Sequence, residues 1–201
     1  MELETTLDRI VDAALALYNK QGVRKTSLED VATKAGITRI TIYRHFGSKK
    51  LLVRAVCMKI AGFFQREAVP GPAQSMSDFD ERLGRLGLSL FNLPPGNLLG
   101  WMEEVSRIYP DVYREFRDVR QTAIDDIFQQ ALETASRAGT LRENLNREVL
   151  KAIFWTGVVG LLENPALISS HVPLAEIFST VTGVFRFGIL KNPQERANAH
   201  E

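Results

Sequence analysis

The segment that most constrains the fold of this chain spans residues 27–50 and reads SLEDVATKAGITRITIYRHFGSKK. Ala32 and Gly36 lie four residues apart in it. A small side chain at the first position lets two helices approach closely, and a glycine at the second supplies the left-handed backbone that ends a helix. Ile37 and Ile42 follow at the spacing of a helix-turn-helix. The pattern therefore predicts two short helices joined by a tight turn.

Charge is divided unevenly along the 201 residues, whose net charge is only +1. Residues 1–60 contain 11 Lys and Arg against 6 Asp and Glu, whereas residues 61–201 contain 14 against 18. Basic side chains also gather on or beside the second predicted helix, namely Lys34, Arg39, Arg44 and Lys49. A basic helix of this kind suits the major groove of DNA, where phosphate contacts position it.

Composition limits the class of protein. Apolar residues make up 45% of the chain, which is enough for a full core, and the single Cys57 excludes a disulfide within the chain. Cys57 lies in an apolar helical run, so we expect a buried hydrophobe rather than a redox sensor. The sequence begins without a signal-peptide pattern, and its longest apolar run, 152–162, is too short to cross a bilayer. We therefore expect a cytoplasmic protein without a membrane partner.

Helical spacing of apolar residues recurs throughout, and the sequence predicts an all-α fold. The first helix is expected to end at Gly22, and Thr26 with Glu29 predicts a capping box for the second. The fourth helix, capped by Ser48, is expected to turn Leu51 and its apolar neighbours toward the core. Further helices are expected over about 77–92, 97–108, 110–137, 146–163 and 174–190.

A Pro-Gly-Pro run at residues 69–73 suggests the main division of the chain. The expected organisation is an N-terminal three-helix head with the helix-turn-helix, a linking helix, a helical ligand-binding and dimerisation body, and a frayed polar tail. These parts correspond to residues 1–48, 49–68, 69–190 and 191–201.

The helix over residues 38–46 is the expected DNA-reading element. Ile37, Ile42 and Phe46 are predicted to face inward. Thr38 is expected to cap the helix, and Arg39 could offer a bidentate fork to guanine. The side chains left on the outer face are Thr38, Arg39, Thr41, Tyr43, Arg44 and His45. His45 could donate to a phosphate or only close the helix end, and the three scattered histidines predict no metal site.

The run T-x-x-T-I-Y-x-H-F-x-S-K-x-x-L over residues 38–52 resembles the signature of the TetR family of bacterial transcriptional regulators. The resemblance covers about residues 5–60. It implies phosphate contacts by Thr26, Tyr43 and Lys49, and base contacts by Thr38, Arg39, Thr41 and Arg44. Ile40 departs from the family pattern, which usually has a small residue there. Its side chain could touch a thymine methyl or pack inward.

The body is rich in aromatic and Met side chains, which suit an apolar ligand pocket but also fill ordinary cores. The family resemblance favours a pocket, and Glu104 would anchor a cationic or hydrogen-bonding ligand if it faced inward; otherwise it belongs to a solvated patch. The predicted ligand contacts are Phe64, Phe91, Trp101, Met102, Glu104, Tyr113, Phe116, Phe128 and Trp155.

Two late segments, 153–162 and 177–188, are apolar almost all round and carry glycines that allow close approach. They are either core helices of a monomer or, as the family resemblance implies, a four-helix dimer interface. We expect the dimer, since helix-turn-helix heads usually read DNA in symmetric pairs. The predicted interface residues are Phe154, Gly157, Val158, Leu161, Phe178, Val181, Val184 and Phe185.

These observations together predict a homodimeric repressor that a small, largely apolar effector releases from double-stranded operator DNA. The helix over 49–68 would couple the two activities. No catalytic grouping or phosphate-binding loop appears in the sequence, so we expect neither enzyme activity nor a cofactor. The alternative is a small-molecule-binding or catalytic all-α protein with a vestigial head.

Overall fold

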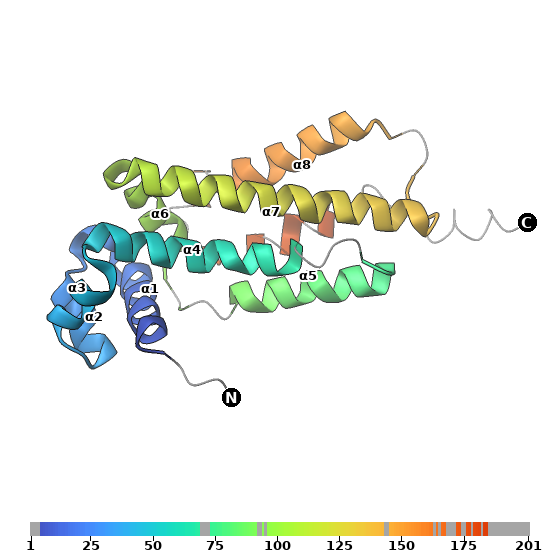
Figure 1. Ribbon diagram of the computed structural model, residues 1–201. Coiled ribbons are helices and arrows are strands. Elements are labelled where there is room, and N and C mark those ends of the chain that lie inside the picture. Colours follow the sequence, from blue (N-terminus) through green and yellow to red (C-terminus); the bar gives the residue numbers. More distant parts are fainter. Residues whose placement is uncertain are drawn as a thin grey trace, which may run out of the picture. The chain divides into compact units, whose positions relative to one another are not determined.

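The computed structural model describes residues 5–68, 73–91, 94, 96–142 and 145–162, together with 164, 166–167, 172–173, 176–177, 179–181 and 183–184. Within these ranges the secondary structure is helical, and the predicted all-α class is confirmed (Figure 1). The helices are α1 (Thr6–Lys25), α2 (Leu28–Ala35), α3 (Arg39–Phe46), α4 (Lys49–Ala68), α5 (Met76–Phe91), α6 (Leu98–Ile108), α7 (Pro110–Arg137) and α8 (Arg147–Leu162).

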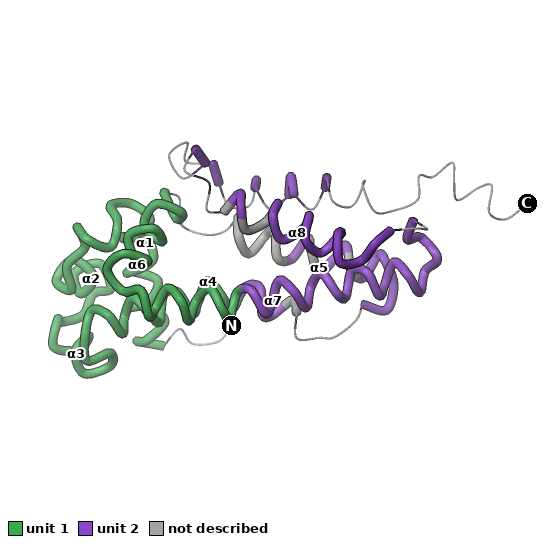
Figure 2. The backbone as a smooth tube through the Cα atoms, turned by 90° about the horizontal axis from the view of Figure 1, so that it is seen from above, with its two compact units in different colours: residues 1–62, 93–120 green, residues 63–92, 121–201 purple. Residues whose placement is uncertain are grey.

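The chain forms two compact units that do not follow its order (Figure 2). Unit 1 contains residues 1–62 and 93–120, and unit 2 contains residues 63–92 and 121–201. The long helices α4 and α7 each contribute residues to both units. Unit 1 thus combines the helix-turn-helix with α6 and the first part of α7. The predicted division into residues 1–48, 49–68 and 69–190 stays a prediction.

Helix α1 continues past the residue at which the sequence predicted its end. Thr5 caps its beginning in a reciprocal pair of hydrogen bonds with Asp8. At Gly22 the backbone leaves helical geometry, with φ of 84° and ψ of 165°, and the helix then resumes to Lys25. Those angles are essentially open to glycine alone. The predicted stop is therefore a kink.

Helix α2 begins with a capping box that lies one residue later than predicted. The Ser27 hydroxyl accepts from the Asp30 backbone, and the Asp30 carboxylate accepts from the Ser27 backbone at 2.7 Å. The Thr26–Glu29 prediction is wrong because Thr26 turns into the head, where only 1% of its surface is exposed. The helix ends at Gly36 in the predicted left-handed conformation, with φ of 66°.

The core of unit 1 is formed by side chains from α1, α2, α3, α4 and α6. Ile10, Leu15, Val31 and Ile42 are buried, and Leu52 is buried at the start of α4. Leu51, predicted to face the core, is instead exposed, because it lies on the opposite side of α4 from that core. Cys57 is buried as predicted. Burial raises the pKa of its thiol to about 12.

Unit 2 is built around an aromatic and aliphatic cluster between α7 and α8. Phe128, Leu132, Ala135 and Leu150 are buried together. The ring of Phe154 stacks on that of Phe128 at a centroid distance of 4.7 Å. Among the helices that the structure describes, none has the length and apolar content needed to cross a membrane.

Candidate nucleic-acid interface

Helix α3 is held by one buried side chain and two caps, which leave most of its surface open. Ile42 is fully buried, as predicted, whereas Ile37 and Phe46 are only half-buried. The Thr38 hydroxyl accepts from the Thr41 backbone at 3.2 Å and lies 2.9 Å from the Thr41 hydroxyl. Both threonines are therefore tied to the first turn of the helix, and Thr38 is the predicted N-cap.

Arg39 and Tyr43 form a pair on the exposed surface of α3. The Arg39 guanidinium donates to the Tyr43 hydroxyl at 3.1 Å and lies 5.3 Å from the centre of its ring. This hydrogen bond raises the pKa of Arg39, so the guanidinium stays charged. The hydrogen bond to Tyr43 uses one of the five N–H donors of Arg39, and the bidentate contact with guanine that the sequence suggested stays a prediction.

The remaining side chains of α3 that were predicted to face DNA are exposed. Ile40 is 77% exposed, so its side chain points outward and not into the head. Arg44 and His45 are exposed, as is Tyr43 at 43%. The helix thus presents an open face on which cationic, aromatic and apolar groups alternate, while its opposite side packs on the head.

Two predicted phosphate ligands lie elsewhere than expected. Thr26 is buried, and its hydroxyl donates to the Gly22 carbonyl at 2.7 Å, so its side chain cannot reach a phosphate in this arrangement. Lys49 is half-buried and donates to the Val23 carbonyl at 2.7 Å. Burial lowers the pKa of Lys49, an effect that Glu104 and Asp30 partly offset. A phosphate contact by Lys49 stays a prediction.

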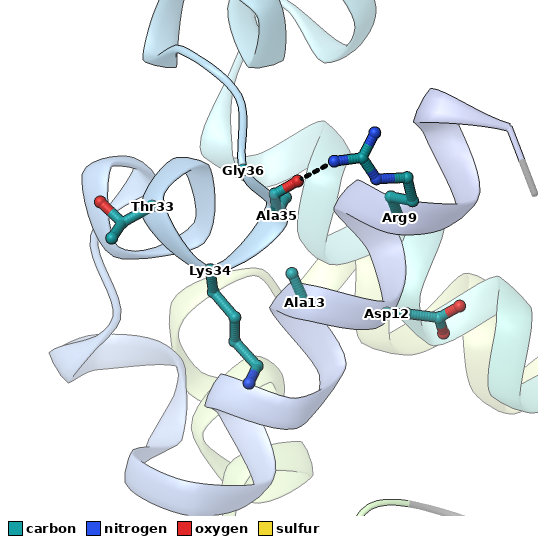
Figure 3. A pocket seen from close by; sticks show the side chains of 7 residues that line it. All are labelled: Arg9, Asp12, Ala13, Thr33, Lys34, Ala35 and Gly36. Atoms are coloured by element: carbon teal, nitrogen blue, oxygen red, sulfur yellow. Dashed lines mark hydrogen bonds between the residues drawn. The ribbon is translucent and has the colours of Figure 1, made fainter.

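The helix-turn-helix is fixed to α1 by a contact at its turn (Figure 3). The Arg9 guanidinium donates to the Ala35 carbonyl at 2.5 Å, beside Gly36. A cation at this place compensates for the unpaired carbonyls at the end of α2. An open hollow lies between the two helices, lined by Arg9, Asp12, Ala13, Thr33, Lys34, Ala35 and Gly36. Asp12 in this hollow is paired with Lys59 of α4 at 2.5 Å.

A second contact, which we name the α1–α6 joint, surrounds Asn19 on the C-terminal half of α1. The Asn19 side chain donates to the Pro94 carbonyl at 2.6 Å and accepts from Trp101 Nε1 at 2.6 Å. The backbone carbonyl of Asn19 accepts from the Asn97 backbone N–H at 3.0 Å. Asn19 and Trp101 are 3% and 1% exposed, so these bonds form in a dry environment where each is costly to lose.

Glu104 extends the joint to the kink in α1. Its carboxylate accepts from the Arg24 backbone at 3.0 Å. Both of its oxygens lie 2.8 Å from where a Cβ on Gly22 would stand. On the same segment of α1, the Val23 carbonyl accepts from Lys49 of α4. The end of α1 is therefore held by a carboxylate from α6 and an ammonium from α4.

The residues predicted to bind a ligand are divided between the two units. Trp101, Met102, Glu104, Tyr113 and Phe116 belong to unit 1, and Phe64, Phe91, Phe128 and Trp155 belong to unit 2. The polar atoms of Trp101 and Glu104 are engaged in the α1–α6 joint, so both have a structural role that the sequence did not reveal. Trp155 donates to Asp125 at 2.7 Å. The side chain of Phe91 lies outside the described residues. Ligand contacts by this set stay predictions.

The residues predicted to form a dimer interface are described in part. Phe154, Gly157, Leu161 and Val181 are half-buried, and Val184 is 71% exposed. Phe178, Phe185 and the side chain of Val158 lie outside the described residues. Val149 and Ile153, which were not among the individually predicted interface residues, are 55% and 62% exposed one turn apart on α8. Their apolar i, i+4 spacing was the signal for them.

Comparison with known proteins agrees with the fold and with the helix-turn-helix. Residues 10–56 match the family model described as bacterial regulatory proteins, tetR family. The chain is 29% identical over 180 residues to the HTH-type transcriptional regulator TtgR of Pseudomonas putida, and the match covers 86% of each chain. A solved structure of SmeT, described as the repressor of the Stenotrophomonas maltophilia multidrug efflux pump SmeDEF, aligns with a TM-score of 0.58 and 20% identity over 94% of this chain and 93% of SmeT. A SmeT–triclosan complex aligns with a TM-score of 0.60 and 20% identity over the same shares. Together with the geometry of α2 and α3, these matches show that residues 10–56 form the helix-turn-helix domain of the TetR family of bacterial transcriptional regulators, and the SmeT structures show that the chain shares their fold.

Proposed function

We propose that this protein is a cytoplasmic, homodimeric repressor that a small, largely apolar effector releases from its operator. The observation that carries the proposal is the exposed face of α3, where Arg39, Tyr43 and Arg44 stand beside Ile40. Cationic and hydroxyl groups there suit phosphates and base edges. The head supports this face through Arg9 and the α1–α6 joint, which fix the helices behind it.

DNA binding is tested by gel shift against the DNA that flanks the protein's own gene, with salt as the variable. Because phosphate contacts release counterions, a head making about 6–10 such contacts should lose about 10³–10⁵ in affinity between 50 and 200 mM salt. An affinity that stayed flat over this range would contradict the proposal. A protein that bound no DNA but did bind small molecules would support the alternative, a vestigial head.

Dimerisation is supported by the exposed apolar side chains of α8. Val149 and Ile153 share one face of the helix, and a Cβ at Gly157 or Gly160 would meet open space. Burying such a face against a second copy removes apolar surface from water. We expect Ile153→Glu to convert the dimer to monomers in sedimentation equilibrium, with helical content unchanged. The exposed Leu7 on α1 gives a control, since Leu7→Glu should leave the dimer intact.

The effector is expected to bind among the aromatic side chains of unit 2. Phe64 and Phe128 are buried there, and Trp155 is half-buried. Triclosan, the ligand of the SmeT complex, is the first probe. An effector must raise the melting temperature of the protein and weaken its DNA complex, and typical coupling of about 1–3 kcal/mol corresponds to roughly 5–150-fold. A compound that raised the melting temperature and strengthened the DNA complex would reverse the proposed sign.

Coupling between the two activities is proposed to use α4, together with the α1–α6 joint. Helix α4 contributes residues to both units, and its Lys49 holds the end of α1. The joint adds a second connection, because Glu104 of α6 holds the same end of α1. An effector shifts the equilibrium only by its differential affinity for the two states of these elements.

A further inference from the structure

Ile40 is the most exposed large apolar side chain in the described part of the chain. Its exposure is 77%, compared with 45% for Leu7 on α1 and 49% for Leu51 on α4. A β-branched residue is a weak helix former, and an exposed one gains no free energy from burial. Nothing in the free protein therefore favours isoleucine at this position.

The place of Ile40 on α3 is that of a base-contacting residue. It precedes the buried Ile42 by two positions, which turns it about 200° around the helix, away from the head. It is the second residue of α3, and helices of this motif touch base edges with their N-terminal residues. Arg44, one turn later, is exposed on the same face.

The polar groups that flank Ile40 are engaged with one another. The hydroxyls of Thr38 and Thr41 lie 2.9 Å apart, and the Arg39 guanidinium donates to the Tyr43 hydroxyl. In the first turn of α3 the apolar side chain of Ile40 therefore stands between two pairs of polar side chains, each hydrogen-bonded within itself. In the major groove the one apolar group that a base edge presents is the C5 methyl of thymine.

We infer that Ile40 reads a thymine methyl in each operator half-site. The inference rests on the proposed DNA-binding function and adds a specificity-determining contact to it. The burial of one methyl corresponds to about fourfold in affinity, and two symmetric half-sites give about 15-fold for the dimer.

The test uses the DNA segment that the wild-type protein protects next to its own gene. Each symmetric pair of thymines in that segment is replaced by deoxyuridine, which lacks only the methyl. One pair should weaken wild-type binding about 15-fold, and Ile40→Ala should bind both duplexes equally. Ile40→Val, which keeps a β-branched side chain, should retain part of the preference.

Leu7→Ala is the matched control, because it also removes an exposed apolar side chain from the head, and it should keep the full thymine preference. A protein that protects a DNA segment but tolerates every deoxyuridine replacement would overturn the inference alone. So would an Ile40→Ala variant with the wild-type preference. A protein that protects no segment at any salt concentration would overturn the DNA-binding function itself, and the reading of thymine with it.

Discussion

The outer face of α3 and the α1–α6 joint are both polar, but they are stabilised in opposite ways. On α3 the bonded pairs are three or four residues apart and exposed to water. In the joint, Asn19 bonds to groups 75 and 82 residues away, in a dry environment. Exposed pairs can exchange protein partners for DNA at little cost, whereas buried ones cannot be broken without a large penalty. The protein thus combines an adaptable face with a rigid support.

The largest effect is expected when the side-chain amide of Asn19 is removed, which tests whether the α1–α6 joint is a rigid support. Asn19→Leu leaves Trp101 Nε1 and the Pro94 carbonyl without their bonds to the amide in a buried position. We expect a loss of about 2–4 kcal/mol in the free energy of unfolding, measured by urea titration. The control Trp101→Phe keeps an aromatic ring against Tyr18 and removes one donor, so it should cost about half as much. A loss below about 0.5 kcal/mol for Asn19→Leu would show that the joint is not a rigid support.

The kink in α1 gives the next largest effect. Gly22→Ala imposes a side chain on a backbone with φ of 84° and ψ of 165°, and its Cβ would also displace the Glu104 carboxylate. We expect a loss of about 2–3 kcal/mol in unfolding free energy. Gly139→Ala is the matched control, since Gly139 also has positive φ but faces open space, and it should cost only about 1 kcal/mol. Equal losses would mean that Glu104 contributes nothing at the kink.

Alkaline pH tests the dryness of unit 1 through Cys57. Its pKa of about 12 in the folded protein lies above the ordinary 9.0, so the unfolded thiol loses its proton first as the pH rises. Folding stability contributed by the neutral thiol is therefore complete below about pH 9 and falls between about pH 9 and 12. From about pH 8 to about pH 10, wild type should lose about 1 kcal/mol more than Cys57→Ala in urea titrations. Parallel losses in the two proteins would indicate that water reaches the thiol.

Variants on α3 should have the smallest effect on stability. Tyr43→Phe and Arg39→Ala remove one exposed pair, so the free energy of unfolding should change by less than about 0.5 kcal/mol. Gel shifts should nevertheless show weaker DNA binding, uniformly across sequences for Tyr43→Phe. If Arg39→Ala also relaxed base preference, this result would support the contact between Arg39 and guanine that the sequence suggested. An Arg39→Ala variant that lost affinity equally for all sequences would instead indicate a phosphate contact. A large loss of stability in either variant would show that the outer face of α3 also stabilises the fold.

The sequence predicted what depends on local spacing. The bounds of α7 agree with the predicted 110–137, and the turn at Gly36 and the cap at Thr38 are where the pattern put them. These features follow from residues within one turn of each other. The capping box of α2 was displaced by one residue because the buried environment of Thr26, which local sequence does not show, competes with capping.

The α1–α6 joint could not be predicted from spacing. Its bonds depend on α6 returning to α1 after about 80 residues, and the position of that return is set by packing. A single signal was present, since Asn19 follows Tyr18 on the apolar side of a helix where a polar residue must find a partner. Trp101 and Glu104 were predicted as ligand contacts because an aromatic residue and a carboxylate suit a pocket as well as a joint.

The assignment of α6 to unit 1 bears on how regulators of this kind can be recombined. A hybrid that joined residues 1–48 to the body of another regulator would separate Asn19 from Trp101 and Arg24 from Glu104. It would carry the DNA-reading helix but bury unmatched polar groups unless the recipient supplied equivalents. An exchangeable reading module of this protein therefore consists of two separate stretches of sequence, residues 1–62 and 93–120. Specificity can be transplanted by changing side chains on α3 more safely than by cutting the chain after it.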